Sequence, residues 1–273
     1  MTIDLDAYFQ RIGYRGPREP TLEALSALHV LHPAAIPFEN LDPLFGRPVS
    51  LDLAALQSKI VEHRRGGYCF EQNALFRAAL EAMGFAITPL IARVVWMAPP
   101  EAPLGPRSHM LLKVDMTDGP YVADVGFGGY IYSSPLKLAP EIEQRTADGI
   151  FRLVPVGDAL ALEARLPAGW SALYRFNLEP AERSDYEVSN WYTSTHPRSL
   201  FVNNLLAERL TPKVRVSLLN RHLTRRYPDG RTEAVVLDNA EAFTEVLETE
   251  FDLAPPVDPA TLFEKIPAGP DPA

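Results

Sequence analysis

The stretch Arg65-Gly66-Gly67-Tyr68-Cys69-Phe70-Glu71-Gln72-Asn73 holds the only cysteine of the 273-residue chain. Two glycines precede the thiol, and a helix-forming run over 73–83 follows it. Five residues follow one another at steps of four, three, four and three, so they share one face of a helix: Cys69, Asn73, Phe76, Leu80 and Met83. We therefore expect Cys69 at the N-terminal tip of a core-facing helix.

A thiol at that position meets unpaired backbone N–H groups and the positive end of the helix dipole. Both favour the thiolate, which is the reactive form of cysteine. The alternative is an inert thiol that only fills the core, which is the common state of a free cysteine. The choice between the two depends on which side chains the fold brings to Cys69.

Composition narrows the class of protein. The chain is 47% hydrophobic and 22% charged, as expected of a globular protein, and its 26 basic and 35 acidic residues give a net charge of −9. That charge argues against a general nucleic-acid binder, although a local basic patch can still hold phosphates. One cysteine excludes an intramolecular disulfide, the N-terminus is acidic, and no stretch approaches the roughly 20 apolar residues of a membrane span. We expect a cytoplasmic monomer or homodimer with no nucleic-acid or membrane partner.

The first third of the chain predicts helices. One covers 6–12 and stops at Gly13, and the next starts at Thr21 as N-cap and ends at His32-Pro33. Another covers 53–61 and ends at the basic pair Arg64-Arg65, with Gly66 as the cap beyond it. After Gly84 the pattern changes to strands.

Strands are expected over 86–96, 109–116 and 121–125, with a hairpin turn over 117–120 between the last two. Further strands over 151–156, 159–166 and 173–178 indicate an antiparallel sheet or a small barrel. A helix or turn is then expected over 185–193, strands over 213–218, 221–227 and 232–236, and a helix over 239–248. The Pro- and Ala-rich tail after Leu253 either wraps the surface or is loose.

A cysteine nucleophile needs a base, and the base needs an orienting group. His109 opens one strand of the predicted hairpin and Asp124 lies on the other, so counting outward from the turn brings them together. For His109 alone the alternative is a satisfied core histidine. Asp124 lies among apolar residues and needs a partner, because burying a lone charge is costly.

The remaining histidines are weaker candidates for the base. His29 and His32 lie on or beside an amphipathic helix as core or capping groups, His63 is expected to be exposed, and His196 and His222 have polar settings. None of these has zinc-ligand spacing, so we expect no metal.

Glycines cluster directly after Asp124. Gly126, Gly128 and Gly129 serve either a turn or a wall against which a substrate or a phosphate-bearing cofactor lies. The chain has no P-loop and no convincing dinucleotide fingerprint.

At these residues the sequence closely resembles the arylamine N-acetyltransferases. The matching segments follow one another in family order: 36–41, 65–73, Ser108-His109-Met110, 124–129 and 190–201. The resemblance implies an α+β, multi-lobed fold with a Cys-His-Asp core like that of cysteine proteases. It further implies an N-terminal helical bundle over 1–84 with the nucleophile, a central antiparallel β-barrel over 85–181 with His and Asp, and an α/β lid over 182–273.

What the resemblance implies for function is ping-pong acetyl transfer. The family triad falls on Cys69, His109 and Asp124, and acetyl-CoA is the donor cosubstrate that leaves an acetyl thioester on the cysteine. The acceptor is an arylamine, an arylhydrazine or an N-arylhydroxylamine, in the setting of xenobiotic metabolism. Backbone N–H groups near Cys69 are the candidates for an oxyanion hole.

Further residues match family positions. Glu39 and Arg65 match a structural ion pair that supports the active site, the alternative being two solvated charges. Positions lining the aromatic substrate pocket fall on Phe38, Val94, Phe127 and Phe201, each of which is otherwise plain core. Ser108 and Gly126 match positions near the coenzyme and the acyl group.

Two other functions share these features. A papain- or transglutaminase-like thiol hydrolase or acyltransferase also uses Cys, His and Asp, so the triad alone does not separate the classes. A catalytically inactive binding module would keep the fold and lose a triad member, and none is lost here.

Overall fold

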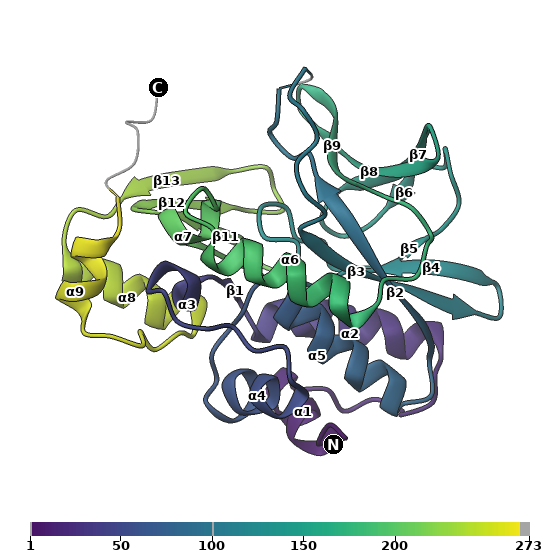
Figure 1. Ribbon diagram of the computed structural model, residues 1–273, viewed down its shortest axis with the longest axis horizontal. Coiled ribbons are helices and arrows are strands. Elements are labelled where there is room, and N and C mark those ends of the chain that lie inside the picture. The colour runs from purple at the N-terminus through teal and green to yellow at the C-terminus, as the bar shows by residue number, and fades with distance from the viewer. Residues whose placement is uncertain (1, 100, 268–273) are drawn as a thin grey trace.

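The computed structural model describes residues 2–99 and 101–267. The N-terminal third is helical, as predicted: α1 (Leu5–Ile12), α2 (Leu22–Ala35), α4 (Leu53–Leu56) continuing as the π-helical turn η1 (Gln57–Glu62), and α5 (Cys69–Ala82). Gly13 ends α1 with φ +73°, and Thr21 caps α2 by accepting the Ala24 N–H through its hydroxyl. In Figure 1, α5 lies against β2 (Ala86–Val94) and β3 (His109–Met116) of the central sheet.

The middle of the chain forms an antiparallel sheet with the strand order β5-β4-β3-β2-β9-β8-β7-β6. Its strands are β2 (Ala86–Val94), β3 (His109–Met116), β4 (Gly119–Ala123), β5 (Leu136–Lys137), β6 (Gln144–Arg145), β7 (Ile150–Val156), β8 (Ala159–Leu166) and β9 (Gly169–Phe176). The β3–β4 hairpin confirms the predicted turn, with Met116 opposite Gly119.

The two ends of this sheet meet. Pro140 forms a parallel bridge with Leu153 of β7. The Gln144 side chain also hydrogen-bonds the backbone N–H and carbonyl of Lys137, at 2.6 and 2.8 Å. The sheet is therefore a nearly closed antiparallel β-barrel, and the α+β class is confirmed.

A second antiparallel sheet has the order β1-β10-β11-β12-β13. It combines β1 (Phe38–Glu39) with β10 (Leu206–Leu210), β11 (Arg215–Leu219), β12 (His222–Arg226) and β13 (Thr232–Val236). The helices of this part are α3 (Leu41–Leu44), α6 (Arg183–Thr195), α7 (Leu200–Asn203), α8 (Ala240–Phe251) and α9 (Pro259–Lys265). Through β1, this mainly C-terminal sheet pairs with the segment that leads to the helical layer (Figure 1).

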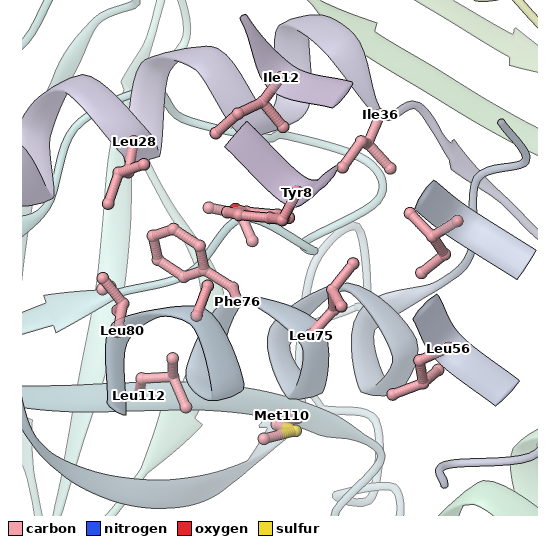
Figure 2. Close-up of a cluster of buried hydrophobic side chains, with 14 of the residues drawn as sticks. Tyr8, Ile12, Leu28, Ile36, Leu56, Leu75, Phe76, Leu80, Met110 and Leu112 are labelled. Atoms are coloured by element: carbon pink, nitrogen blue, oxygen red, sulfur yellow. The ribbon is translucent and has the colours of Figure 1, made fainter. Parts of the chain in front are cut away.

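Apolar residues alternate between two cores along β3, because successive side chains of a strand point to opposite faces. Met110 and Leu112 pack against α5 and belong to the core that α5 shares with α1 and α2, and Figure 2 shows them on the far side of α5 from Leu28 and Tyr8. Leu111 faces the barrel interior instead. This two-sided burial fixes the register of the strand that begins at His109.

Two sequence expectations were wrong in detail. Pro33 lies inside α2, which runs on to Ala35, because a proline in the last turn costs only one helical hydrogen bond. Gly66 is not the helix cap: η1 ends at Glu62 and Arg64 takes the left-handed conformation, with φ +52°. The tail after Leu253 carries α9, which buries Leu262, and residues 268–273 lie outside the described part of the chain.

Within residues 2–99 and 101–267, every helix is too short or too polar to cross a membrane.

Candidate active site

Cys69 is the first residue of α5, as the sequence predicted, and it is 3% exposed. Its helix begins where Glu71 accepts the Tyr68 backbone N–H at 3.1 Å. The Cys69 Sγ lies 3.5 Å from the Ser108 carbonyl oxygen, at the entrance to β3. The thiol therefore lies between the tip of a helix and the first residue of a barrel strand.

The structure brings His109 and Asp124 together. In the β3–β4 ladder Leu112 pairs with Ala123, so Asp124 follows directly beyond the end of β4 and lies diagonally across from His109. The His109 Nε2 and Asp124 Oδ2 atoms are 2.7 Å apart, and both side chains are buried. Because Asp124 occupies Nε2, Nδ1 is the ring nitrogen that remains for a second partner.

Several hydrogen bonds fix the position of Asp124. Its Oδ1 accepts the Asn73 Nδ2 at 2.9 Å and the Gly126 backbone N–H at 3.0 Å. Its own backbone N–H donates to Nε2 of His29 at 3.0 Å. A carboxylate with several hydrogen-bond donors stays ionised, and it keeps the imidazole in one orientation.

Burial and charge act in opposite directions on the His109 ring. Burial lowers the pKa of His109, but the charge of Asp124 and hydrogen bonds to Asp124 and Cys69 outweigh it and raise the pKa to about 10. Burial of Asp124 raises its own pKa, but the nearby His109 more than offsets this, so the net shift is downward. Because the folded His109 pKa exceeds its ordinary value of 6.5, the stability gained from its charge is complete below pH 6.5 and lost as pH rises through about 10.

Two further buried histidines, His29 and His32, are uncharged and hold neighbouring segments by hydrogen bonds. Burial lowers the pKa of His29 to about 4 and that of His32 to about 3. Nε2 of His32 is 2.6 Å from Gln72 Oε1, and the Gln72 amide donates to the Pro37 and Gly67 carbonyl oxygens at 2.8 and 3.2 Å. This chain of hydrogen bonds ties α2 to the loop that leads into Cys69.

Glycine is required where the loops approach α5. A Cβ atom on Gly126 would lie 2.9 Å from the Cys69 Cα, and one on Gly66 would lie 2.2 Å from the Pro37 carbonyl oxygen. Such contacts with backbone atoms leave no room for a side chain. Gly66 is thus explained by close packing rather than by helix capping.

A cluster of buried charges supports the start of α5. Arg65 lies 2.7 Å from Glu39 and 3.4 Å from Asp42, so the structure brings the predicted pair together. Lys59 continues the cluster, at 2.6 Å from Asp42 and 2.7 Å from Glu71. Since Glu71 also holds the Tyr68 N–H, the cluster positions the residue that precedes the thiol.

The residues predicted to line the substrate pocket lie in different surroundings. The Phe127 ring lies 5.1 Å from the His109 ring, edge to face, and is buried. Phe38 is buried against the half-buried Phe201, with centroids 5.9 Å apart. Val94 ends β2 and is 38% exposed, whereas Ser108 is half-buried and adjoins the thiol through its carbonyl.

Sequence reasoning missed residues that hold the site through amide groups. Asn73 bridges Asp124, the Met110 carbonyl and the Val125 N–H. Asn40 donates to the Phe201 and Asn204 carbonyls, both at 2.7 Å, and so holds α7. Asn73 lies four residues after Cys69 on the predicted buried face, and a polar side chain there was the available signal.

Asn73→Ala is expected to lower the free energy of unfolding by about 3 kcal/mol, because it leaves buried partners without hydrogen bonds. Urea unfolding monitored by circular dichroism measures this. Glu81→Ala on the same helix removes only an exposed ion pair to Arg77 and is expected to cost under about 0.5 kcal/mol. Equal losses in the two variants would contradict the assigned role of Asn73.

Comparisons with known proteins agree with this geometry. A family model described as N-acetyltransferase matches residues 21–257. The arylamine N-acetyltransferase of Mycobacterium tuberculosis (strain ATCC 25618 / H37Rv) is 43% identical over 256 residues, covering 93% of this chain and 90% of the relative. The arylamine N-acetyltransferase / N-hydroxyarylamine O-acetyltransferase of Salmonella typhimurium is 41% identical over 254 residues, with coverages of 93% and 90%.

Solved structures agree as well. The Mycobacterium marinum arylamine N-acetyltransferase in complex with CoA superposes with a TM-score of 0.92 at 40% identity, covering 96% of this chain and 98% of that one. The fold, the sequence and the family model thus point to one assignment. The chain belongs to the arylamine N-acetyltransferase family.

Proposed function

We propose that Cys69 carries the acetyl group from acetyl-CoA to an arylamine nitrogen, with His109 moving the proton and Asp124 orienting the ring. The enzyme is an arylamine N-acetyltransferase and uses acetyl-CoA as its cosubstrate. The observation that carries the proposal is the buried His109–Asp124 contact of 2.7 Å beside a thiol at the tip of α5. A base, its orienter and a nucleophile in hydrogen-bonded sequence are what thiol acyl transfer requires.

In the first half-reaction the Cys69 thiolate attacks the thioester carbonyl carbon of acetyl-CoA. The new C–S bond forms, the bond to the coenzyme sulfur breaks, and the imidazolium of His109 donates its proton to the departing thiolate. The pKa of His109, raised to about 10, supports a ring that is protonated at neutral pH before this step. Acetyl-Cys69, neutral His109 and free CoA remain.

In the second half-reaction the arylamine nitrogen attacks the acetyl carbon of the Cys69 thioester. Neutral His109 accepts the amine proton and the Cys69 thiolate leaves, which restores the resting pair. Acetylation removes the negative sulfur that helps to raise the pKa of His109. The ring is therefore better suited to act as a base in this half than in the resting enzyme.

Each half-reaction passes through a negatively charged oxygen. Cys69 begins α5, and the backbone N–H groups in the first turn of a helix have no carbonyl partners within the helix. We propose that they stabilise the oxyanion, a contribution of roughly 3 kcal/mol per donor in other enzymes.

Acceptors beyond simple arylamines follow from relatives. The Salmonella typhimurium relative is also named as an N-hydroxyarylamine O-acetyltransferase, and we propose the same hydroxylated acceptors for this chain. Arylhydrazines present a similar uncharged nitrogen nucleophile beside an aromatic ring.

No observation favours a papain-like hydrolase. The thiol is 3% exposed, which does not suit a peptide substrate bound across an open groove.

Intact-mass spectrometry after mixing with acetyl-CoA, without acceptor, tests the covalent intermediate. We expect one acetyl group on the wild-type chain and none on Cys69→Ala. Wild-type protein that stays unmodified, or an acetyl group that persists in Cys69→Ala, would overturn the proposal.

A further inference from the structure

Glu208 on β10 is a buried carboxylate outside the catalytic residues, and it grips the loop that follows Asp124. Its Oε2 accepts the Gly129 backbone N–H at 2.6 Å, and its Oε1 accepts the Ile131 N–H at 3.2 Å. The residue is 2% exposed. One side chain of the second sheet thus holds two backbone groups of a loop that belongs to the barrel.

Arg215 on β11 completes this contact. Its Nη1 lies 2.9 Å from Glu208 Oε1, and its guanidinium stacks on the Tyr130 ring at 4.3 Å. Both charged side chains are more than nine-tenths buried. A buried ion pair carries a considerable desolvation cost, and in some proteins such a pair specifies one conformation.

The loop held in this way lies against the reacting groups. Gly126 packs so closely on α5 that a Cβ atom there would lie 2.9 Å from the Cys69 Cα, and the Phe127 ring contacts the His109 ring. Gly128 abuts the Phe38 ring, where a Cβ atom would lie 2.4 Å away. The loop residues therefore lie directly beside both Cys69 and His109.

Phe38 is also held by Glu208. It pairs directly with Glu208 in the β1–β10 ladder, so Glu208 holds the loop with its side chain and the Phe38 strand with its backbone. The relative positions of Phe127 and Phe38 therefore depend on one residue of β10. The Cys69–His109–Asp124 contacts do not include Glu208 and are held by Asn73, Gly126 and α5.

We propose that Glu208 is a positioning residue that sets the aromatic wall for the acceptor, and that it acts on the second half-reaction far more than on acetylation of Cys69. This inference rests on the proposed function, because it concerns the two half-reactions of that function. Glu208 positions residues for the second half-reaction, whereas other residues hold the catalytic groups used in the first. An acceptor with a flat ring needs the Phe127 and Phe38 rings at a fixed separation. The acetyl group is small, and its transfer to sulfur depends on the separately held catalytic residues.

Steady-state kinetics separates the two halves. In a ping-pong reaction, kcat/KM for acetyl-CoA reports on the first half and kcat/KM for the arylamine on the second. Glu208→Gln is expected to lower kcat/KM for the arylamine about tenfold, as displacement of a positioning wall does. It is expected to leave kcat/KM for acetyl-CoA, and the rate of acetyl-Cys69 formation by quenched intact mass, within about twofold of wild type.

Two companion variants keep the test decisive. Glu233→Gln on β13 removes a half-exposed partner of Arg231 in the same sheet and is expected to change neither constant. Glu208→Gln combined with Arg215→Met removes both buried charges, which guards against misfolding from an unpaired arginine, and is expected to show the same split.

An equal fall in both constants, or an unchanged arylamine constant in the Glu208 variants, would overturn the positioning role. Failure of the wild-type enzyme to form acetyl-Cys69 would instead overturn the proposed function.

Discussion

Cys69→Ser is expected to lower kcat/KM for arylamine acetylation by at least about 10⁴-fold. The serine hydroxyl is nearly isosteric but holds its proton far more tightly than a thiol, so the resting pair with His109 does not form. Because Cys69 is the only cysteine, no second thiol can replace it. Chromatographic detection of the acetylated amine at fixed acetyl-CoA measures the change.

The fold provides the control for this variant. Cys69 occupies the first position of α5 with its side chain buried, and serine fits there without a cavity. Urea unfolding midpoints within experimental error of wild type would show that the loss is chemical. Retention of more than a tenth of wild-type kcat/KM would remove Cys69 from the reaction.

Asp124→Asn is expected to slow turnover by about 10³-fold and to slow alkylation of Cys69 by iodoacetamide at pH 6 at least about tenfold. The charge of Asp124 is the main influence that raises the pKa of His109 to about 10 against the opposing effect of burial. Without it, only the contacts with Cys69 oppose the lowering of the His109 pKa by burial, and we expect the ring to be neutral at pH 6. The imidazolium that stabilises the thiolate is then lost.

The pH profile shows the sign of this effect. In the wild type, His109 stays protonated from pH 6 to about 9, so alkylation should remain fast below the range in which an ordinary thiol ionises. Asp115→Asn, one strand residue from the turn and half-exposed beside Lys113, is the matched control and is expected to alkylate like wild type. Equal rates for wild type and Asp124→Asn at pH 6 would show that Asp124 does not set the charge on His109.

Local patterns predicted the centre of the site well. The four- and three-residue spacing after Cys69 gave the helix and its buried face, and the hairpin turn gave the register that joins His109 to Asp124. Both depend on residues close together in the chain, where periodicity and turn chemistry act directly.

What the sequence did not reveal depends on distant pairings. The two-residue strand β1 has no periodicity of its own and exists because it pairs with β10, far along the chain. The contact of Glu208 with the loop after Asp124 could not be predicted either, because it joins residues that lie far apart in the sequence. The helix ends at Glu62, and Gly66 four residues later resembled its cap because glycine is the usual residue beyond a helix end. Tight packing against Pro37 is what requires glycine at that position.

The most direct measurement of the central claim is a single-turnover transfer from isolated acetyl-enzyme. Protein acetylated by acetyl-CoA is freed of coenzyme by rapid gel filtration and mixed with an arylamine alone. We predict that the acetyl group leaves Cys69 and appears as one equivalent of the N-acetylated amine at a rate at least equal to kcat. An adduct that persists, or amide that forms only when acetyl-CoA is present again, would contradict transfer through Cys69.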